Sequence, residues 1–306
     1  LNGSRAGALT VANRTVLLTG AAGGLGRGTT LQFLRAGTRV VALDIDAPML
    51  EMLSQDAKAE NLSGLTACQT DLADLKALRV RLELVSQDLG GFDVVINNAA
   101  IYPSKEFEDY TIEEHQAVQR VNVDAAIVCV QVALPHMKRK NWGRIINVSS
   151  VTAYGGWGRL SPYVQSKGAL VGLTRAWARE FGPYGVTVNA VSPGAFPTAA
   201  EKIHPDPAGY ERFVLEHQAI KRRGCTHDIA NALLYLASEE SAFVTGQTLN
   251  VDMQLALATL QETVTVSGDA QALALAIEAE VEHEDLVRRE HRVVRHAGHR
   301  RERRQR

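Results

Sequence analysis

The sequence predicts an α/β protein with a doubly wound parallel sheet of about seven strands, flanked by helices and followed by a C-terminal extension. Short apolar runs alternate with longer segments of helical periodicity from residue 14 to residue 251. Nearly all of the short runs are almost continuously apolar, as expected for strands that helices cover on both faces. Alternation of this kind favours parallel strands joined by right-handed crossovers.

The strands are expected, in chain order, at residues 15–19, 39–43, 65–69, 93–97, 144–149, 186–191 and 248–251. Helical periodicity places the intervening helices at about residues 24–36, 47–58, 73–88, 111–138, 162–181 and 226–238. We interpret residues 13–254 as one domain, because the alternation fills this range. Residues 1–12 form an N-terminal arm; the absent initiator methionine indicates a trimmed start, and the arm is assigned no function.

Residues 255–306 differ from the domain in composition, being rich in Ala, Glu, His and Arg without lysine or any aromatic residue. We interpret them as a non-catalytic tail, either disordered or translated in a shifted reading frame; an added helix that docks on a neighbouring subunit is the alternative. The arginines could contact nucleic-acid phosphates. Because no aromatic residue is present to stack bases, nucleic acid is not the expected partner.

The overall composition is that of a soluble protein, with 45% apolar residues and a formal net charge of -1. Three widely spaced cysteines fit neither a disulfide framework nor a CxxC pair, which favours the reducing cytoplasm. No apolar run approaches the ~18 residues that span a bilayer, so no membrane partner is expected. The histidines form no HxxxH or HExxH grouping near the core, and no metal is expected.

The first strand runs directly into the turn T19-G-A-A-G-G-L-G26 and then into a helix. Glycines at such a turn let the backbone approach a pyrophosphate, which the helix N-terminus also attracts. The expected cofactor contacts here are Gly20, Gly24, Leu25 and Gly26. Asp44 ends the second strand, where a carboxylate can accept the ribose hydroxyls of an adenosine and repel a 2′-phosphate. NAD is therefore favoured over NADP.

The spacing TGxxxGxG resembles that of the short-chain dehydrogenase/reductase family, which has a Rossmann fold, and further matches follow in the family's order over residues 14–251. The resemblance implies that Asp71, followed by Leu72, meets the adenine. The family's NNAG motif is present as N97-N-A-A100, with alanine replacing the last glycine, and it adds Asn98 and Ala99 to the cofactor contacts.

The active-site pattern of the family matches Asn122, Ser150, Tyr163 and Lys167, and the thirteen-residue gap before the tyrosine selects Ser150 over Ser149. By resemblance, Asn122 keeps a water in the proton path and Lys167 holds the nicotinamide ribose. The segment S192-P-G-A-F-P-T198 matches the family's turn after strand six, which implies that Pro193, Phe196 and Thr198 line the nicotinamide side.

The spacing of Tyr163 and Lys167 places both side chains on one face of a helix. A tyrosine phenol titrates near ~10 in isolation, too high for a base at neutral pH. We expect the lysine ammonium, together with an oxidised nicotinamide, to lower this pKa, so that Tyr163 exchanges a proton with the substrate oxygen. Ser150 is expected to hydrogen-bond the same oxygen.

Specificity is expected to lie in the variable lid at residues 195–224, whose mixture of aromatic, histidine and charged side chains suits a polar or hydroxylated substrate. His204 and His217 are interpreted as surface or packing residues. Trp157 and Arg159 are expected to wall the pocket, with Tyr154 as a further candidate; Arg159 could equally lie at a subunit interface.

These observations predict an NAD-dependent alcohol dehydrogenase or ketone reductase acting on a small hydroxylated or cyclic substrate. Two alternatives remain open: a ketoreductase of acyl-carrier-protein substrates, and an NAD(H)-binding sensor or scaffold without turnover. The family resemblance further implies a homotetramer or dimer built through residues 111–138 and 162–181.

Overall fold

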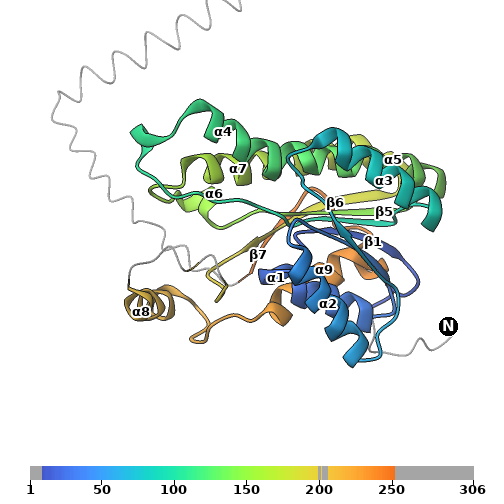
Figure 1. Ribbon diagram of the computed structural model, residues 1–306, viewed down its shortest axis with the longest axis horizontal. Coiled ribbons are helices and arrows are strands. Elements are labelled where there is room, and N and C mark those ends of the chain that lie inside the picture. The colour runs from blue at the N-terminus through green and yellow to red at the C-terminus, as the bar shows by residue number, and fades with distance from the viewer. Residues whose placement is uncertain (1–8, 199–200, 202–205, 252–306) are drawn as a thin grey trace, which may run out of the picture. The chain divides into compact units, whose positions relative to one another are not determined.

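The computed structural model describes residues 9–198, 201 and 206–251, which form one parallel sheet between two layers of helices (Figure 1). All strand pairs are parallel, in the order β3-β2-β1-β4-β5-β6-β7. The strands are β1 (Thr15–Thr19), β2 (Arg39–Asp44), β3 (Leu65–Gln69), β4 (Val94–Asn97), β5 (Gly143–Val148), β6 (Val186–Pro193) and β7 (Thr248–Val251).

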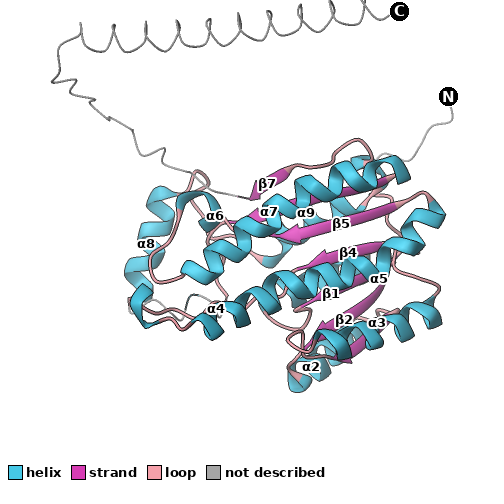
Figure 2. Ribbon diagram, turned by 90° about the horizontal axis from the view of Figure 1, so that it is seen from above, coloured by secondary structure: helices cyan, strands magenta, loops and turns pink. Residues whose placement is uncertain are grey.

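The two helical layers bury separate apolar clusters against the two faces of the sheet. One layer contains α1 (Gly24–Arg35), α2 (Ala47–Ala59) and α9 (Thr226–Ala237). The other contains α3 (Leu75–Leu89), α4 (Ile112–Gln119), α5 (Ala125–Lys140) and α7 (Ser161–Phe181). Two short helices, α6 (Thr152–Gly155) and α8 (Pro207–His217), lie at the end of the molecule where the strands finish (Figure 2).

The predicted fold class is confirmed, and every predicted strand is present with bounds that differ by at most two residues. Coverage on both faces is incomplete at the two edges of the sheet, because Ala67 and Gln69 of β3 and Leu249 and Asn250 of β7 are exposed. β7 has a hydrogen-bonded neighbour only on the β6 side, so it is an edge strand of the described sheet.

The segment predicted as a single helix over residues 111–138 is interrupted. A π-helical turn at Arg120–Asp124 separates α4 from α5. Asn122 lies in this turn and forms hydrogen bonds outside its own helix, which is a typical setting for a π-bulge. Hydrophobic periodicity continues through the turn, so the sequence pattern does not reveal it.

The prediction also missed α8. Its sequence signal is Asp206 followed by Pro207, because the Asp206 carboxylate accepts a hydrogen bond from the Gly209 amide and proline suits the first helical turn. Most of the N-terminal arm, His204 and the tail at 255–306 lie outside the described residues, so those expectations stay predictions.

Residues Ile112–Lys140 are long and apolar enough, with a mean hydropathy of 1.4 over the best window, to cross a membrane by composition alone. Half of that window is buried inside the protein, and α5 packs against β4, β5 and α3. This is the behaviour of a core helix that covers a sheet, which is why its composition is apolar.

Candidate active site

The predicted site residues gather at the carboxyl ends of the strands. Gly20 follows β1, Asn98 follows β4, Ser150 follows β5 and Pro193 ends β6. The strand order reverses between β1 and β4, because the chain winds outward from this pair in both directions. In open parallel sheets ligands bind in the crevice at such a switch point.

Two positions of the glycine turn require glycine, because a Cβ atom there would collide with the backbone. Gly20 has φ 62°, and a side chain there would place Cβ 2.9 Å from Cα of Ala99. At Gly26 a Cβ would lie 1.8 Å from the carbonyl oxygen of Gly20, so only glycine lets α1 begin so close to β1. Gly24 has φ 47°, and Leu25 packs against the core in the first turn of α1.

Asp44 links the end of β2 to the glycine turn. Its carboxylate accepts hydrogen bonds from the backbone amides of Ala22 at 2.9 Å and Asp46 at 3.2 Å. Asp71 lies beyond β3 with its carboxylate bound to the Ala73 amide at 2.8 Å, and Leu72 beside it is buried. The turn and the Asp44 carboxylate together fit the pyrophosphate and adenosine ribose of a dinucleotide.

Asn98 and Ala99 brace β4 against β1. The Asn98 side-chain amide donates to the carbonyl oxygens of Thr19 and Gly20, at 2.9 and 3.0 Å. The backbone amides of both residues donate to Oγ1 of Thr19. Alanine at position 100 leaves these bonds intact. Sequence reasoning missed the role of Thr19, which is visible only once the two strands are adjacent.

Ser150, Tyr163 and Lys167 come together at the end of β5. The phenol of Tyr163 is hydrogen-bonded with Ser150, whose Oγ also accepts from Oγ1 of Thr152 at 2.9 Å. Nζ of Lys167 lies 5.5 Å from the centroid of the Tyr163 ring and donates to the carbonyl oxygen of Val148 at 2.7 Å. The helical spacing therefore places both side chains on the sheet side of α7.

Asn122 is held entirely by the protein. Its Oδ1 accepts from the Ile101 amide at 2.8 Å, and its Nδ2 donates to the Ile101 carbonyl at 3.0 Å and to Oγ of Ser166 at 2.9 Å. Asn122 thus joins the loop after β4 to the helix that carries Tyr163. Whether it also holds a water stays a prediction.

Without a cofactor, Lys167 is not among the groups that shift the pKa of the Tyr163 phenol, and the joint effect expected of Lys167 and an oxidised nicotinamide stays a prediction. Burial raises the pKa of the Tyr163 phenol, and the hydrogen bond with Ser150 only partly opposes this. Burial also lowers the pKa of Lys167 to about 7. A lysine that is only partly charged near neutral pH is a weak source of positive potential, and spacing along a helix carries no information about this loss of solvent.

Tyr102 is a site residue that sequence reasoning missed. Its ring meets that of Tyr163 edge to face, with centroids 6.0 Å apart, and it contributes to the raised pKa of the Tyr163 phenol. In the sequence, Tyr102 stands two residues after Ala100, the last residue of the NNAA motif, and this position was the available signal. The ring of Tyr102 therefore lies directly beside that of Tyr163.

The segment after β6 lies opposite the glycine turn. A Cβ added to Gly24 would be 4.0 Å from the Thr198 side chain, which places Thr198 beside the expected pyrophosphate position. Phe196 is buried against Gly224, and the Pro193 carbonyl accepts from the Val151 amide at 3.3 Å. That Pro193, Phe196 and Thr198 line the nicotinamide side stays a prediction.

The residues expected around the substrate do not all lie at one pocket in the structure. Arg159 forms an ion pair with Glu106 at 3.0 Å, and Trp157 is exposed. Tyr154 instead lines a groove beside β7. His217 stacks on Phe213, with centroids 4.2 Å apart, in agreement with its interpretation as a packing residue.

Fold and site together define a dinucleotide-binding α/β protein with a Ser, Tyr and Lys set beside the cofactor crevice. A family model described as enoyl-(acyl carrier protein) reductase matches residues 20–253. The chain belongs to the short-chain dehydrogenase/reductase family, whose relatives support oxidoreductase chemistry on CH–OH or keto groups with a nicotinamide cofactor.

Individual relatives differ in their substrates. The chain is 34% identical to subunit BbsD of a (2S)-((R)-hydroxy(phenyl)methyl)succinyl-CoA dehydrogenase from Thauera aromatica, over 79% of this chain and 96% of that protein. It is also 34% identical to the 3-oxoacyl-(acyl-carrier-protein) reductase FabG of Thermotoga maritima, over 80% of this chain and 98% of that protein.

A similar solved structure is assigned to an NAD(P)-dependent gluconate 5-dehydrogenase from Beutenbergia cavernae, with NADP bound at low occupancy. It superposes with a TM-score of 0.76 at 30% identity, covering 80% of this chain and 97% of that chain. The relatives therefore include proteins named for thioester and for sugar-acid substrates, and their names do not select one substrate class for this chain.

Proposed function

We propose that this protein is an NAD-dependent oxidoreductase that interconverts a small hydroxylated or cyclic secondary alcohol and its ketone, with Tyr163 as the acid/base. The observation that carries the proposal is the Ser150, Tyr163 and Lys167 set at the end of β5, on the same sheet edge as the glycine turn and Asp44.

The chain's own residues supply binding and proton transfer. The glycine turn and the N-terminus of α1 would hold the pyrophosphate, and Thr198 lies opposite them. The nicotinamide, when bound, supplies the hydride acceptor or donor. Tyr163 removes the proton from the substrate alcohol or returns it to the ketone, and Ser150 donates a hydrogen bond to the oxygen on which charge develops. Lys167 would contact the nicotinamide ribose.

Asp44 supports NAD rather than NADP. Its carboxylate stands at the end of β2, tied to two backbone amides, where the adenosine ribose of a dinucleotide is expected. A fixed negative charge there favours two free hydroxyls and repels a 2′-phosphate.

A panel of sugars, polyols and cyclic alcohols, each with NAD and with NADP, tests the proposal by NADH or NADPH absorbance. We expect turnover of at least one alcohol, faster with NAD. Tight NADH binding without turnover on any substrate would instead support a non-catalytic sensor or scaffold.

Replacing Tyr163 tests the mechanism itself. Tyr163→Phe should lower kcat by about 100-fold or more, the usual contribution of a positioned acid/base. Tyr235→Phe is the matched control, because Tyr235 lies on α9 away from the strand ends and is partly exposed. Equal activity in wild type and Tyr163→Phe would refute the assignment.

A second candidate is the reduction of a 3-oxoacyl thioester. It is favoured by the relatives named for coenzyme A and acyl-carrier-protein substrates. Acetoacetyl-CoA assayed with NADH and NADPH distinguishes the two candidates: turnover of the thioester with no activity on the alcohol panel would select the reductase.

We further propose that the protein works in the cytoplasm as a homotetramer or dimer that pairs α4, α5 and α7. The support is the partly exposed, largely apolar α4–α5 stretch and the resemblance to the family. Light scattering of the purified chain measures the number of subunits.

A further inference from the structure

The loop after β4 and the loop before α7 are joined at one phenol, that of Tyr110. Its oxygen lies 2.8 Å from the carbonyl oxygen of Arg159 and 2.5 Å from that of Pro103. The same oxygen accepts a hydrogen bond from the Lys105 amide at 3.2 Å. Because a phenol carries one proton, the two carbonyl oxygens share it. The Tyr110 hydroxyl therefore connects three backbone groups from two loops.

Tyr110 is itself held by the helix that follows it. The next residue, Thr111, is the N-cap of α4 and forms a capping box with Glu114. The Thr111 hydroxyl accepts from the Glu114 amide at 3.1 Å, and the Glu114 carboxylate accepts from the Thr111 amide at 3.1 Å. Lys105 pairs with the same carboxylate. The first turn of α4 thus fixes the backbone of the residue that carries the phenol.

The Arg159 carbonyl is the acceptor in the second loop. Arg159 has φ 66°, a left-handed conformation that a residue with a side chain keeps only where its surroundings hold it. Its carbonyl oxygen accepts from the Lys105 amide at 3.1 Å as well as from Tyr110. The ion pair between Arg159 and Glu106 joins the same loops, but more than half of each side chain is exposed, so this pair adds little.

Tyr102 lies between two fixed points of the loop after β4. Asn122 forms hydrogen bonds with the amide and the carbonyl of the residue before Tyr102, at 2.8 and 3.0 Å. Tyr110 donates to the carbonyl of the residue after Tyr102. With both neighbours held, the Tyr102 ring is kept edge to face with the Tyr163 ring, at a centroid distance of 6.0 Å.

We propose that Tyr110 is a positioning residue, whose hydroxyl joins the two loops and so keeps the Tyr102 ring against that of Tyr163. The inference rests on the proposed function, in which Tyr163 is the acid/base. Tyr110 acts only through the backbone of the two loops, whereas Tyr102 acts on the phenol of Tyr163 directly. Removal of the Tyr110 hydroxyl therefore releases the Tyr102 ring without altering any group of the Ser150, Tyr163 and Lys167 set.

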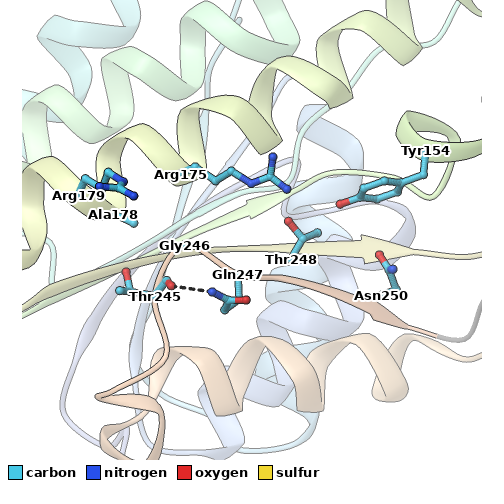
Figure 3. Close-up of a pocket in the computed structure, with 9 residues that line it drawn as sticks. All are labelled: Tyr154, Arg175, Ala178, Arg179, Thr245, Gly246, Gln247, Thr248 and Asn250. Atoms are coloured by element: carbon cyan, nitrogen blue, oxygen red, sulfur yellow. Dashed lines mark hydrogen bonds between the residues drawn. The ribbon is translucent and has the colours of Figure 1, made fainter. Parts of the chain in front are cut away.

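A phenol outside both loops provides the matched control. Tyr154 is unsuitable, because it lies on α6 and faces the groove beside β7, which Arg175 and Arg179 also line (Figure 3). Tyr184 lies in the short 3₁₀-helix that follows α7 and is half-exposed. Nζ of Lys138 stands 4.3 Å from the centroid of its ring, a contact that phenylalanine keeps.

NMR of the full chain, labelled at the tyrosine rings, tests the proposal without any turnover. The Tyr163 resonances are assigned by their loss in Tyr163→Phe. The ring current of Tyr102 displaces them, so Tyr102→Leu gives their positions without that ring. We expect Tyr110→Phe, which keeps the aromatic ring and its packing, to shift the Tyr163 resonances toward those positions, and Tyr184→Phe to leave them in place. Unshifted resonances in Tyr110→Phe, or equal shifts in both variants, would overturn the proposal.

The pH dependence of alcohol oxidation is the second readout, on any substrate that the wild type turns over. Oxidation needs the Tyr163 phenolate. Burial raises the pKa of this phenol, the hydrogen bond with Ser150 lowers it and Tyr102 raises it, while Nζ of Lys167 lies 5.5 Å from the ring centroid. Release of Tyr102 removes one raising influence, so Tyr110→Phe should move the midpoint of the kcat profile to lower pH.

A double-mutant cycle shows whether this shift passes through Tyr102. In a Tyr102→Phe background, Tyr110→Phe should leave the midpoint where it is, because the hydroxyl that acts on Tyr163 is already absent. An unmoved midpoint in Tyr110→Phe alone, or the same shift in both backgrounds, would contradict the proposal. Absence of turnover in wild type would refute only the proposed function, because the NMR comparison still decides whether Tyr110 holds Tyr102 in place.

Discussion

Burial of Lys167 makes the stability of this protein depend on pH in a direction that can be worked out. The side chain is 2% exposed, and burial lowers its pKa from 10.5 to about 7. Between these values the unfolded chain carries the proton and the folded chain does not. Protons therefore favour unfolding, and the free energy of unfolding contributed by this group rises with pH across that window.

The magnitude follows from the linkage relation. One proton is bound on unfolding over most of the window, and each pH unit then changes the free energy of unfolding by up to about 1.4 kcal/mol. From about pH 8 to about pH 9, a folded pKa near 7 gives an increase of about 1 kcal/mol. Lys167→Met removes the titrating group and keeps an unbranched side chain of similar length, so this increase should disappear.

Urea unfolding followed by circular dichroism, at one protein concentration and at about pH 8 and pH 9, measures the effect as the difference between wild type and Lys167→Met. Other titrating groups are common to both proteins and cancel in the difference. Lys58→Met, at an exposed position on α2, is the control and should follow wild type. Parallel pH dependences for wild type and Lys167→Met would refute the reasoning, because the folded and unfolded pKa values of Lys167 would then be equal.

Two further predictions concern the cofactor crevice. Asp44→Ala should lower the NAD over NADP preference in kcat/KM by about tenfold or more, since it removes the charge facing a 2′-phosphate, whereas Asp46→Ala should leave the preference unchanged. Gly26→Ala would place Cβ 1.8 Å from the Gly20 carbonyl oxygen and should abolish NADH binding measured by fluorescence. At Gly23 the nearest atom would be 3.6 Å away, so Gly23→Ala should bind NADH within about threefold of wild type.

Local sequence patterns predicted what depends on local rules. The strands are defined by apolar runs, and the glycine turn is defined by positions where a side chain would collide with the backbone, as at Gly26. Asn122 was predicted as a site residue by resemblance, but the π-helical turn that holds it was not. The hydrogen-bond partners of Asn122 in that turn are Ile101 and Ser166, which are distant in sequence and meet Asn122 only in the folded chain.

The surroundings of the groove beside β7 could not be predicted from the sequence either. Arg175 and Arg179 are ordinary charged positions on an amphipathic helix, and nothing in their spacing distinguishes a solvated face from one that lines a groove. Their environment is set by β7, which adds Thr248 and Asn250 beyond the strands that α7 covers, β5 and β6.

Lys167 shows both what spacing in the sequence predicts and what only burial in the folded chain determines. Its spacing from Tyr163 predicts contact, and contact is present, with Nζ 5.5 Å from the ring centroid. The sign of the electrostatic effect, however, depends on how much water each group loses, and burial acts on both against their charged forms. Of the surrounding groups that act on the Tyr163 pKa, Ser150 is the one that lowers it. Ser150 therefore favours the phenolate in addition to its expected hydrogen bond to the substrate oxygen, a second role that the motif alone does not reveal.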